Sequence, residues 1–172
     1  KDRAVGAITA TFPGAIRKVC ASIDTARDIT VIEYGPGTGV CTKYLLGHMT
    51  PGSRYIGIET NGEFADNLER IGDPRLSVVR GDARDVLDIM HTLGVKKADY
   101  IISSIPCTFF SDTDRKRLVN VTRAALAPQG MFLVYQYSPL MKRYLEKDFE
   151  SVRLRIIPFH LPSLFVMEAR RP

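Results

Sequence analysis

Three glycines stand at alternate positions, Gly35, Gly37 and Gly39, directly after an apolar run that ends near Glu33. Glycines in such a loop let the main chain approach a ligand closely, because they carry no Cβ. A dinucleotide site has the spacing G-x-G-x-x-G, but Val40 occupies the place of the third glycine here. The Glu33 carboxylate would also repel a pyrophosphate. The loop therefore favours a ligand that carries positive charge.

Two more acids follow the next two apolar runs of the chain. Glu59 ends the second run, where a carboxylate can accept both hydroxyls of a ribose. Asp82 follows the third run, where it can accept the amino group of adenine while the Ala83 N–H faces the ring. S-adenosylmethionine (SAM) suits this set, since it has a sulfonium and an ammonium group and no phosphate. The alternative for each acid is a helix N-cap or a solvated turn residue.

The elements that would position these residues alternate along the chain. Short runs rich in Val, Ile and Tyr predict strands at 29–34, 54–59, 76–80, 98–105, 131–137, 151–158 and 163–169. Amphipathic segments predict helices near 38–48, 62–71, 83–93 and 112–127. This alternation indicates an α/β fold with a mostly parallel sheet covered on both faces. The last two strands form a hairpin, so we expect one edge strand to run antiparallel.

A short helix is expected before the first strand. Ile16, Val19, Cys20 and Ile23 form a helical apolar stripe, and Thr11 is a plausible N-cap. We therefore expect a single domain over residues 1–172, with an N-terminal helical segment at 1–24 and a core at 25–172.

The composition of the chain indicates its cellular compartment and the charge of its partners. The 172 residues have 45% hydrophobic content and no apolar run long enough to span a membrane. Three widely spaced cysteines form no metal-type pair, which favours a reduced, cytoplasmic setting and a site without metal. Lys and Arg exceed Asp and Glu by 24 to 19, a mild bias toward anionic partners such as nucleic acid or acidic lipid.

These residues together resemble a class I SAM-dependent methyltransferase, whose seven-stranded Rossmann-like sheet has an antiparallel last strand. "EYGPGTG" is similar to the first motif of that family, and Glu59, Asp82 and "SSIP" are similar to later ones. The resemblance implies SAM as cofactor, S-adenosylhomocysteine (SAH) as product and no metal. The implied cofactor-binding residues are Glu33, Gly35, Pro36, Gly37, Thr38, Gly39, Glu59, Thr60, Asp82, Ala83 and Ser103.

Three further stretches resemble bacterial phospholipid N-methyltransferases of the phosphatidylethanolamine type. They are "RAVGAITATFPGAIRKV" at 3–19, "SSIPCTFFSDTDRKRLV" at 103–119 and "VYQYSP" at 134–139. The chain departs from that group at Ala10 and at "FHLP", 159–162. The resemblance implies a phospholipid acceptor bound near Ser104, Ile105, Pro106, Phe109 and Tyr137.

A headgroup amine is largely protonated at neutral pH, so its loss of a proton must be assisted or must precede binding. The candidate helpers are Tyr137 and His160. Basic residues flank the front helix, namely Lys1, Arg3, Arg17 and Lys18, and the helix after "SSIP", namely Arg115, Lys116 and Arg117. With Phe12, Phe109 and Phe110 they could rest on an anionic membrane, which would place the protein peripherally on the inner face of the cell membrane. The alternative is a solvated basic surface over core aromatics.

Two other functions stay open at this point. One is an enzyme similar to the ribosomal RNA adenine N6-dimethyltransferases, which have the same layout. The base-modifying Asn-Pro-Pro-Tyr or Asp-Pro-Pro-Tyr segment is replaced here by "SSIPCTFF", which argues against a nucleic-acid acceptor without excluding it. The other is a non-catalytic SAM-binding protein that has kept the fold.

Overall fold

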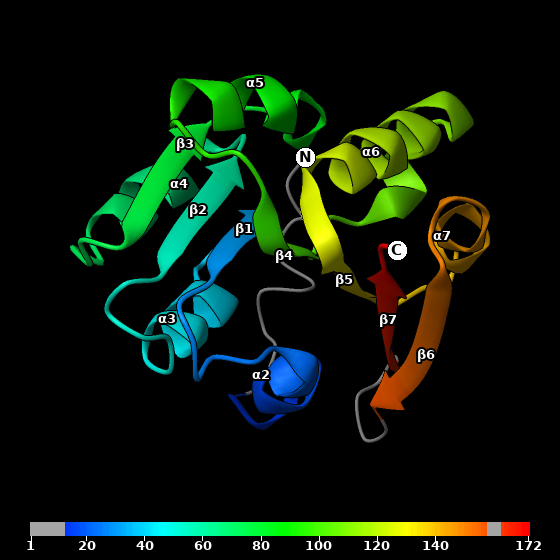
Figure 1. The fold of residues 1–172 in the computed structure, drawn as a ribbon, viewed down its shortest axis with the longest axis horizontal. Helices are drawn as coiled ribbons and strands as arrows, with labels where there is room; N and C mark the ends of the chain where they lie inside the picture. The colour runs from blue at the N-terminus through cyan, green and yellow to red at the C-terminus, as the bar shows by residue number, and fades with distance from the viewer. Residues whose placement is uncertain (1–12, 158–162) are drawn as a thin grey trace.

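The computed structural model describes residues 13–157 and 163–172 of the chain. Within them the chain forms one seven-stranded sheet with the order β3-β2-β1-β4-β5-β7-β6 (Figure 1). Its strands are β1 Thr30–Tyr34, β2 Arg54–Glu59, β3 Leu76–Arg80, β4 Ala98–Ser103, β5 Leu126–Gln136, β6 Ser151–Ile157 and β7 Leu164–Arg170. The expected α/β class with a mostly parallel sheet is therefore confirmed.

The antiparallel strand lies inside the sheet and not at its edge. Strands β1 to β5 pair in parallel, whereas β7 pairs antiparallel with β5 on one side and with β6 on the other. The expectation of an antiparallel edge strand was wrong, because the hairpin inserts its second strand next to β5. The last strand is thus antiparallel, while β6 forms the edge.

Helices cover both faces of this sheet (Figure 1). The predicted helices appear in shorter form, and the segment before α5 is a separate 3₁₀ turn at Ala83–Asp85. A helix that the sequence pattern did not predict, α7, precedes β6. The helices are α2 Pro13–Val19, α3 Val40–Leu46, α4 Gly62–Glu69, α5 Val86–Thr92, α6 Asp112–Ala125 and α7 Lys142–Asp148.

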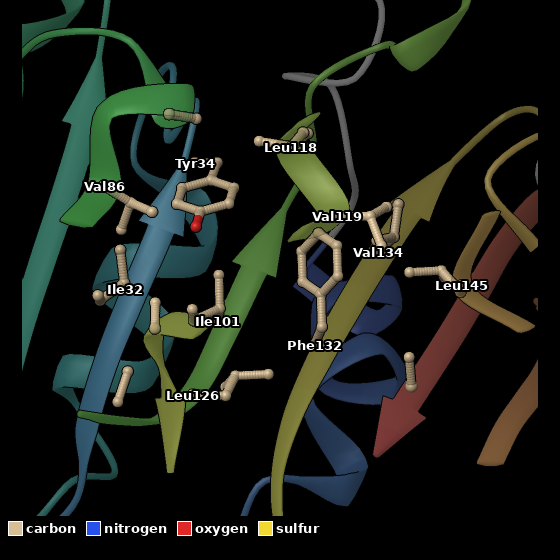
Figure 2. Close-up of a cluster of buried hydrophobic side chains, with 14 of the residues drawn as sticks. Ile32, Tyr34, Val86, Ile101, Leu118, Val119, Leu126, Phe132, Val134 and Leu145 are labelled. Atoms are coloured by element: carbon tan, nitrogen blue, oxygen red, sulfur yellow. The ribbon is translucent and has the colours of Figure 1, made fainter. Parts of the chain in front are cut away.

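The pleat of β1 sends its side chains alternately to two hydrophobic layers. Ile32 and Tyr34 pack under α5 and α6, where Tyr34 meets Phe132 edge-on with ring centroids 6.2 Å apart (Figure 2). The Tyr34 hydroxyl lies 3.1 Å from the Thr122 hydroxyl of α6. Val31 and Glu33 point the other way, toward the layer covered by α2 and α3. The glycine-rich segment after Tyr34 thus follows a strand whose side chains are packed on both faces of the sheet.

The front helix is present and packs by the expected stripe. Ile16, Val19, Cys20 and Ile23 are all buried, although Cys20 belongs to a 3₁₀ turn that follows α2. Arg155 of β6 donates a 2.8 Å hydrogen bond to the carbonyl oxygen of Lys18, which attaches α2 to the hairpin. The expected cap Thr11 lies outside the described residues. So do the expected basic and aromatic residues Lys1, Arg3 and Phe12.

In the described part of the chain, no helix combines the length and the apolar character that a membrane crossing requires.

Candidate active site

A cavity opens where the parallel strands end. Residues 35–39, which we call the glycine loop, form one wall, and the ends of β2 and β3 form the second. The third wall is the segment 104–111 after β4, which we call the acceptor loop. This is the edge of the sheet at which open α/β folds bind their ligands.

The glycine loop has a backbone that other residues rarely adopt. Gly35, Gly37 and Gly39 have φ angles of 66°, 56° and 75°. A Cβ at Gly35 would stand 2.9 Å from the Cγ1 of Ile105 in the acceptor loop, and one at Gly39 would stand 2.8 Å from Leu68 of α4. Gly35 and Gly37 line the cavity, while Gly39 serves the packing of α3 against α4.

Glu59 closes the floor of the cavity and is only 6% exposed. One carboxylate oxygen accepts a hydrogen bond from the Gly37 N–H at 3.0 Å, and the other accepts one from the Asn61 N–H at 2.9 Å. A carboxylate has about four acceptor positions, so two remain for ligand hydroxyls. Glu59 therefore both shapes the glycine loop and offers the acceptors that a ribose needs.

Asp82 lies at the end of β3, where it both lines the cavity and caps the turn that follows. It lines the cavity, and its Oδ1 accepts the Arg84 N–H at 2.8 Å as the cap of the 3₁₀ turn. The guanidinium of Arg84 also pairs with it at 2.6 Å. Hydrogen bonds from Arg84 hold the pKa of Asp82 below its usual range, so the group is a carboxylate at neutral pH.

Glu33 lies behind the cavity and not on its wall. It is fully buried, and its Oε2 accepts hydrogen bonds from the Thr42 hydroxyl at 2.5 Å and from the Tyr55 hydroxyl at 2.6 Å. Its Oε1 has no hydrogen-bond partner among the described residues. Burial raises the pKa of this carboxyl, more than the hydrogen bonds lower it. Glu33 thus ties β1 to α3 and β2 from inside the core.

The acceptor loop is braced from several sides. The Ser104 hydroxyl donates to the Gly35 carbonyl at 2.8 Å, and Arg115 donates to the Cys107 carbonyl at 2.8 Å. Burial raises the pKa of the Cys107 thiol to about 12, so it is not a ready nucleophile. Phe109, by contrast, is 70% exposed at the cavity mouth. The loop is therefore a fixed support for one projecting aromatic ring.

Most of the expected site residues meet around this one cavity. The expected cofactor residues that line it are Gly35, Pro36, Gly37, Thr38, Glu59, Thr60, Asp82 and Ala83. The expected acceptor residues that line it are Ser104, Ile105, Pro106 and Phe109. The structure places four others outside the lining, namely Glu33, Gly39, Ser103 and Tyr137. His160 lies outside the described residues.

The cavity also has walls that the sequence reasoning missed. Ile16 of α2, Cys41 of α3 and Tyr135 of β5 all contribute to them. Tyr135 lies near the end of β5 and is 4% exposed, whereas the expected Tyr137 follows the last residue of that strand. The signal that could have found it is the end of β4: Ser103 is the last residue of β4 and pairs with Val134, so Tyr135 follows at the edge of the sheet where the cavity opens.

The cavity fits SAM by its chemistry. Glu59 offers acceptors for ribose hydroxyls, Asp82 offers an acceptor for an amino group, and glycine backbone lies between them and the acceptor loop. The apolar walls from Ile58 and Ile105 suit an adenine ring. Among the described residues, no cluster of three or more His, Cys, Asp or Glu could hold a metal ion.

Comparison with the sequences of known proteins supports a SAM site in this cavity. No family model matches the chain. An ornithine lipid N-methyltransferase of Singulisphaera acidiphila is 30% identical over 162 residues, which cover 92% of this chain and 84% of that enzyme. A probable ribosomal RNA small subunit methyltransferase A of Methanopyrus kandleri is 38% identical over 90 residues, but these cover 50% of this chain and only 31% of that enzyme.

Two solved structures show the same fold. The N-methyltransferase NodS of Bradyrhizobium japonicum aligns with a TM-score of 0.74 and 13% identity over 99% of this chain and 98% of NodS. Precorrin-6y C5,15-methyltransferase of Geobacter metallireducens aligns with a TM-score of 0.72 and 14% identity over 93% of this chain and 87% of that one. The chain therefore belongs to the class I SAM-dependent methyltransferases.

Proposed function

We propose that this enzyme transfers a methyl group from SAM to the headgroup amine of a phosphatidylethanolamine-type phospholipid. The observation that carries the proposal is the exposed Phe109, which stands at the cavity mouth on the acceptor side. An apolar ring at this place suits an acceptor that arrives with its acyl chains. The similarity to an ornithine lipid N-methyltransferase supports a lipid amine as the acceptor.

The methyl transfer from SAM to the amine requires little covalent chemistry from the protein. The amine nitrogen displaces SAH from the sulfonium methyl in line, so the enzyme acts mainly by holding the two groups in position. The nitrogen must first lose its proton. Tyr137 and His160 are the candidates from the sequence for this proton transfer, and the cavity adds Tyr135 as a residue that can orient the amine. Burial raises the pKa of Tyr135 well above its usual value, so its hydroxyl stays protonated and takes no proton from the ammonium group. Its oxygen can instead accept an N–H of the neutral amine and so direct the nitrogen lone pair toward the methyl group.

The same proposal includes a membrane surface as partner. Arg17 and Lys18 are exposed on α2, whose Ile16 lines the cavity. Each basic side chain near an anionic bilayer adds about 1 kcal/mol of attraction. A peripheral enzyme with this edge toward the lipid would take the headgroup directly into its cavity.

The function is tested by single-turnover transfer of labelled methyl groups. SAM is mixed with the enzyme and with one of four acceptors: phosphatidylethanolamine vesicles, ornithine lipid vesicles, structured ribosomal RNA or bulk protein. We expect label on phosphatidylethanolamine, with phosphatidylcholine vesicles as the control that lacks a free amine. Label on ornithine lipid alone would keep the lipid class and change the headgroup. Label on RNA alone would favour the function of the Methanopyrus kandleri relative.

A further inference from the structure

Arg84 joins two parts of the site that are far apart in the sequence. Its Nε and NH2 groups hold the two oxygens of Asp82 at 2.9 Å and 2.6 Å, and its NH1 reaches Asp114 of α6 at 2.5 Å. Its guanidinium also lies 5.7 Å from the ring centroid of Phe110, which lines the cavity. One side chain therefore contacts the adenine side of the cavity, the acceptor loop and α6.

The contact with α6 reaches the point where the acceptor loop ends. Ser111 caps α6 by accepting the Asp114 N–H at 3.1 Å, and its hydroxyl donates to Asp114 Oδ2 at 2.6 Å. Asp114 thus uses one oxygen for the cap and the other for Arg84. A movement of Arg84 would therefore displace both the N-cap of α6 and the Phe110 ring, because Arg84 contacts Asp114 and Phe110 directly.

The hydrogen bonds of Asp82 show how a ligand would act on Arg84. Among the described residues, its Oδ1 accepts two donors, the N–H and the Nε–H of Arg84, whereas Oδ2 accepts one. Each carboxylate oxygen has about two acceptor positions, so the free position lies on Oδ2. A ligand amino group at this position would share Oδ2 with the guanidinium and so act on its placement.

We propose that Arg84 is a positioning residue that couples occupation of the adenine pocket to the order of the acceptor loop and the first turn of α6. The proposal rests on the assignment of Asp82 to the adenine amino group, and it does not depend on which acceptor is methylated. Coupling of this kind is reciprocal: an ordered acceptor loop would in turn favour cofactor binding.

The test uses hydrogen exchange of the whole protein with and without saturating SAH. We expect SAH to slow exchange of backbone amides at 112–116, a segment that does not line the cavity. Asp114→Asn removes the carboxylate that pairs with Arg84 and that accepts the Ser111 hydroxyl, but it leaves the Arg84–Asp82 pair in place. Its SAH dissociation constant should therefore stay within about twofold of the wild type while the protection at 112–116 disappears. Arg84→Gln removes both arms, so it should weaken SAH binding roughly tenfold and also lose the protection.

A matched control comes from the same helix. Arg117 of α6 also reaches back to the 3₁₀ turn, where it pairs with Asp85 at 3.1 Å, and neither residue lines the cavity. Arg117→Gln should keep both the affinity and the protection. Retained protection in Asp114→Asn, or wild-type affinity in Arg84→Gln, would overturn the coupling. Absence of SAH binding by the wild type would instead remove the cofactor site and the coupling together, whereas failure on lipids alone would leave this result standing.

Discussion

The N–H of Gly37 donates a 3.0 Å hydrogen bond to the carboxylate of Glu59, so the end of β2 holds the glycine loop in place. Gly37 has a φ of 56°, which only glycine adopts easily. The bond places loop backbone and an acidic acceptor side by side at one wall of the cavity. The shape of the cofactor site and its hydrogen-bonding groups thus both depend on the contact between Gly37 and Glu59.

Gly37→Val should abolish SAM binding, because the new side chain would enter the cavity and strain the backbone. Gly72 offers a control with matched strain: its φ is 67°, and a Cβ there would meet nothing within 4 Å. Both variants should lose about 1–2 kcal/mol of stability from the left-handed backbone. Calorimetry should then show SAM binding in Gly72→Val only. Wild-type affinity in a folded Gly37→Val variant would move the site away from this loop.

Glu33 should make stability depend on pH. Burial raises its pKa above the ordinary 4.5, so the native state binds this proton more tightly than the unfolded chain. The resulting stabilisation is complete below the ordinary pKa and is lost as pH rises toward the raised value. Relative to Glu33→Gln, the wild type should therefore lose up to about 1.4 kcal/mol per pH unit above pH 4.5.

Urea unfolding of both proteins between pH 5 and pH 8 measures this difference. Glu69→Gln is the control, since Glu69 is exposed at the end of α4. Its stability should run parallel to that of the wild type. Parallel curves for Glu33→Gln as well would show that Glu33 ionises in the core without cost.

Tyr135 and Tyr137 give a discriminating pair of variants. Of the two, only Tyr135 lines the cavity and can orient the amine, so Tyr135→Phe should lower kcat about tenfold or more while SAM affinity stays unchanged. Tyr137→Phe should leave kcat within about twofold under the same conditions. Methyl transfer at saturating SAM with phosphatidylethanolamine vesicles measures both. The opposite order would return the helper role to Tyr137, as the sequence pattern suggested.

The membrane proposal predicts a dependence on the charge of α2. Reversal of Arg17 and Lys18 to Glu should weaken sedimentation with anionic vesicles, since each charge contributes about 1 kcal/mol. Added salt should weaken wild-type binding in the same way. The matched control reverses Lys96 and Arg123, which are exposed where β4 begins and where α6 ends, away from the cavity. Equal vesicle binding by all three proteins would remove this role from α2.

The sequence predicted the parallel strands well because each is a short buried run with clear ends. It missed α7, whose pattern is short and mostly charged; only Tyr144 and Leu145 of that helix are buried, against the α6 layer. It also started β5 at 131, whereas the strand begins at Leu126 with a register shift opposite Ala98. Such features arise from contacts between elements, which local patterns do not record.

The site was predictable where loop chemistry follows directly from residue type. Glycines after a strand and acids at strand ends fall at the edge of the sheet where the cavity opens, so Gly35, Glu59 and Asp82 were correctly expected on its lining. Tyr135 was missed because the strand end had to be guessed to the residue. Glu33 has the right residue type, but the pleat of β1 turns it toward Thr42 and away from the cavity.

A crystal structure of the protein soaked with SAH tests the cofactor site most directly. The adenine should lie beside Asp82 and Ala83, the ribose hydroxyls should meet Glu59, and the amino-acid end should pass along Gly35 and Gly37. Those positions would leave the acceptor loop and Phe109 facing the sulfur. SAH bound elsewhere on the protein, or an empty cavity at millimolar SAH, would contradict the assignment of this cavity.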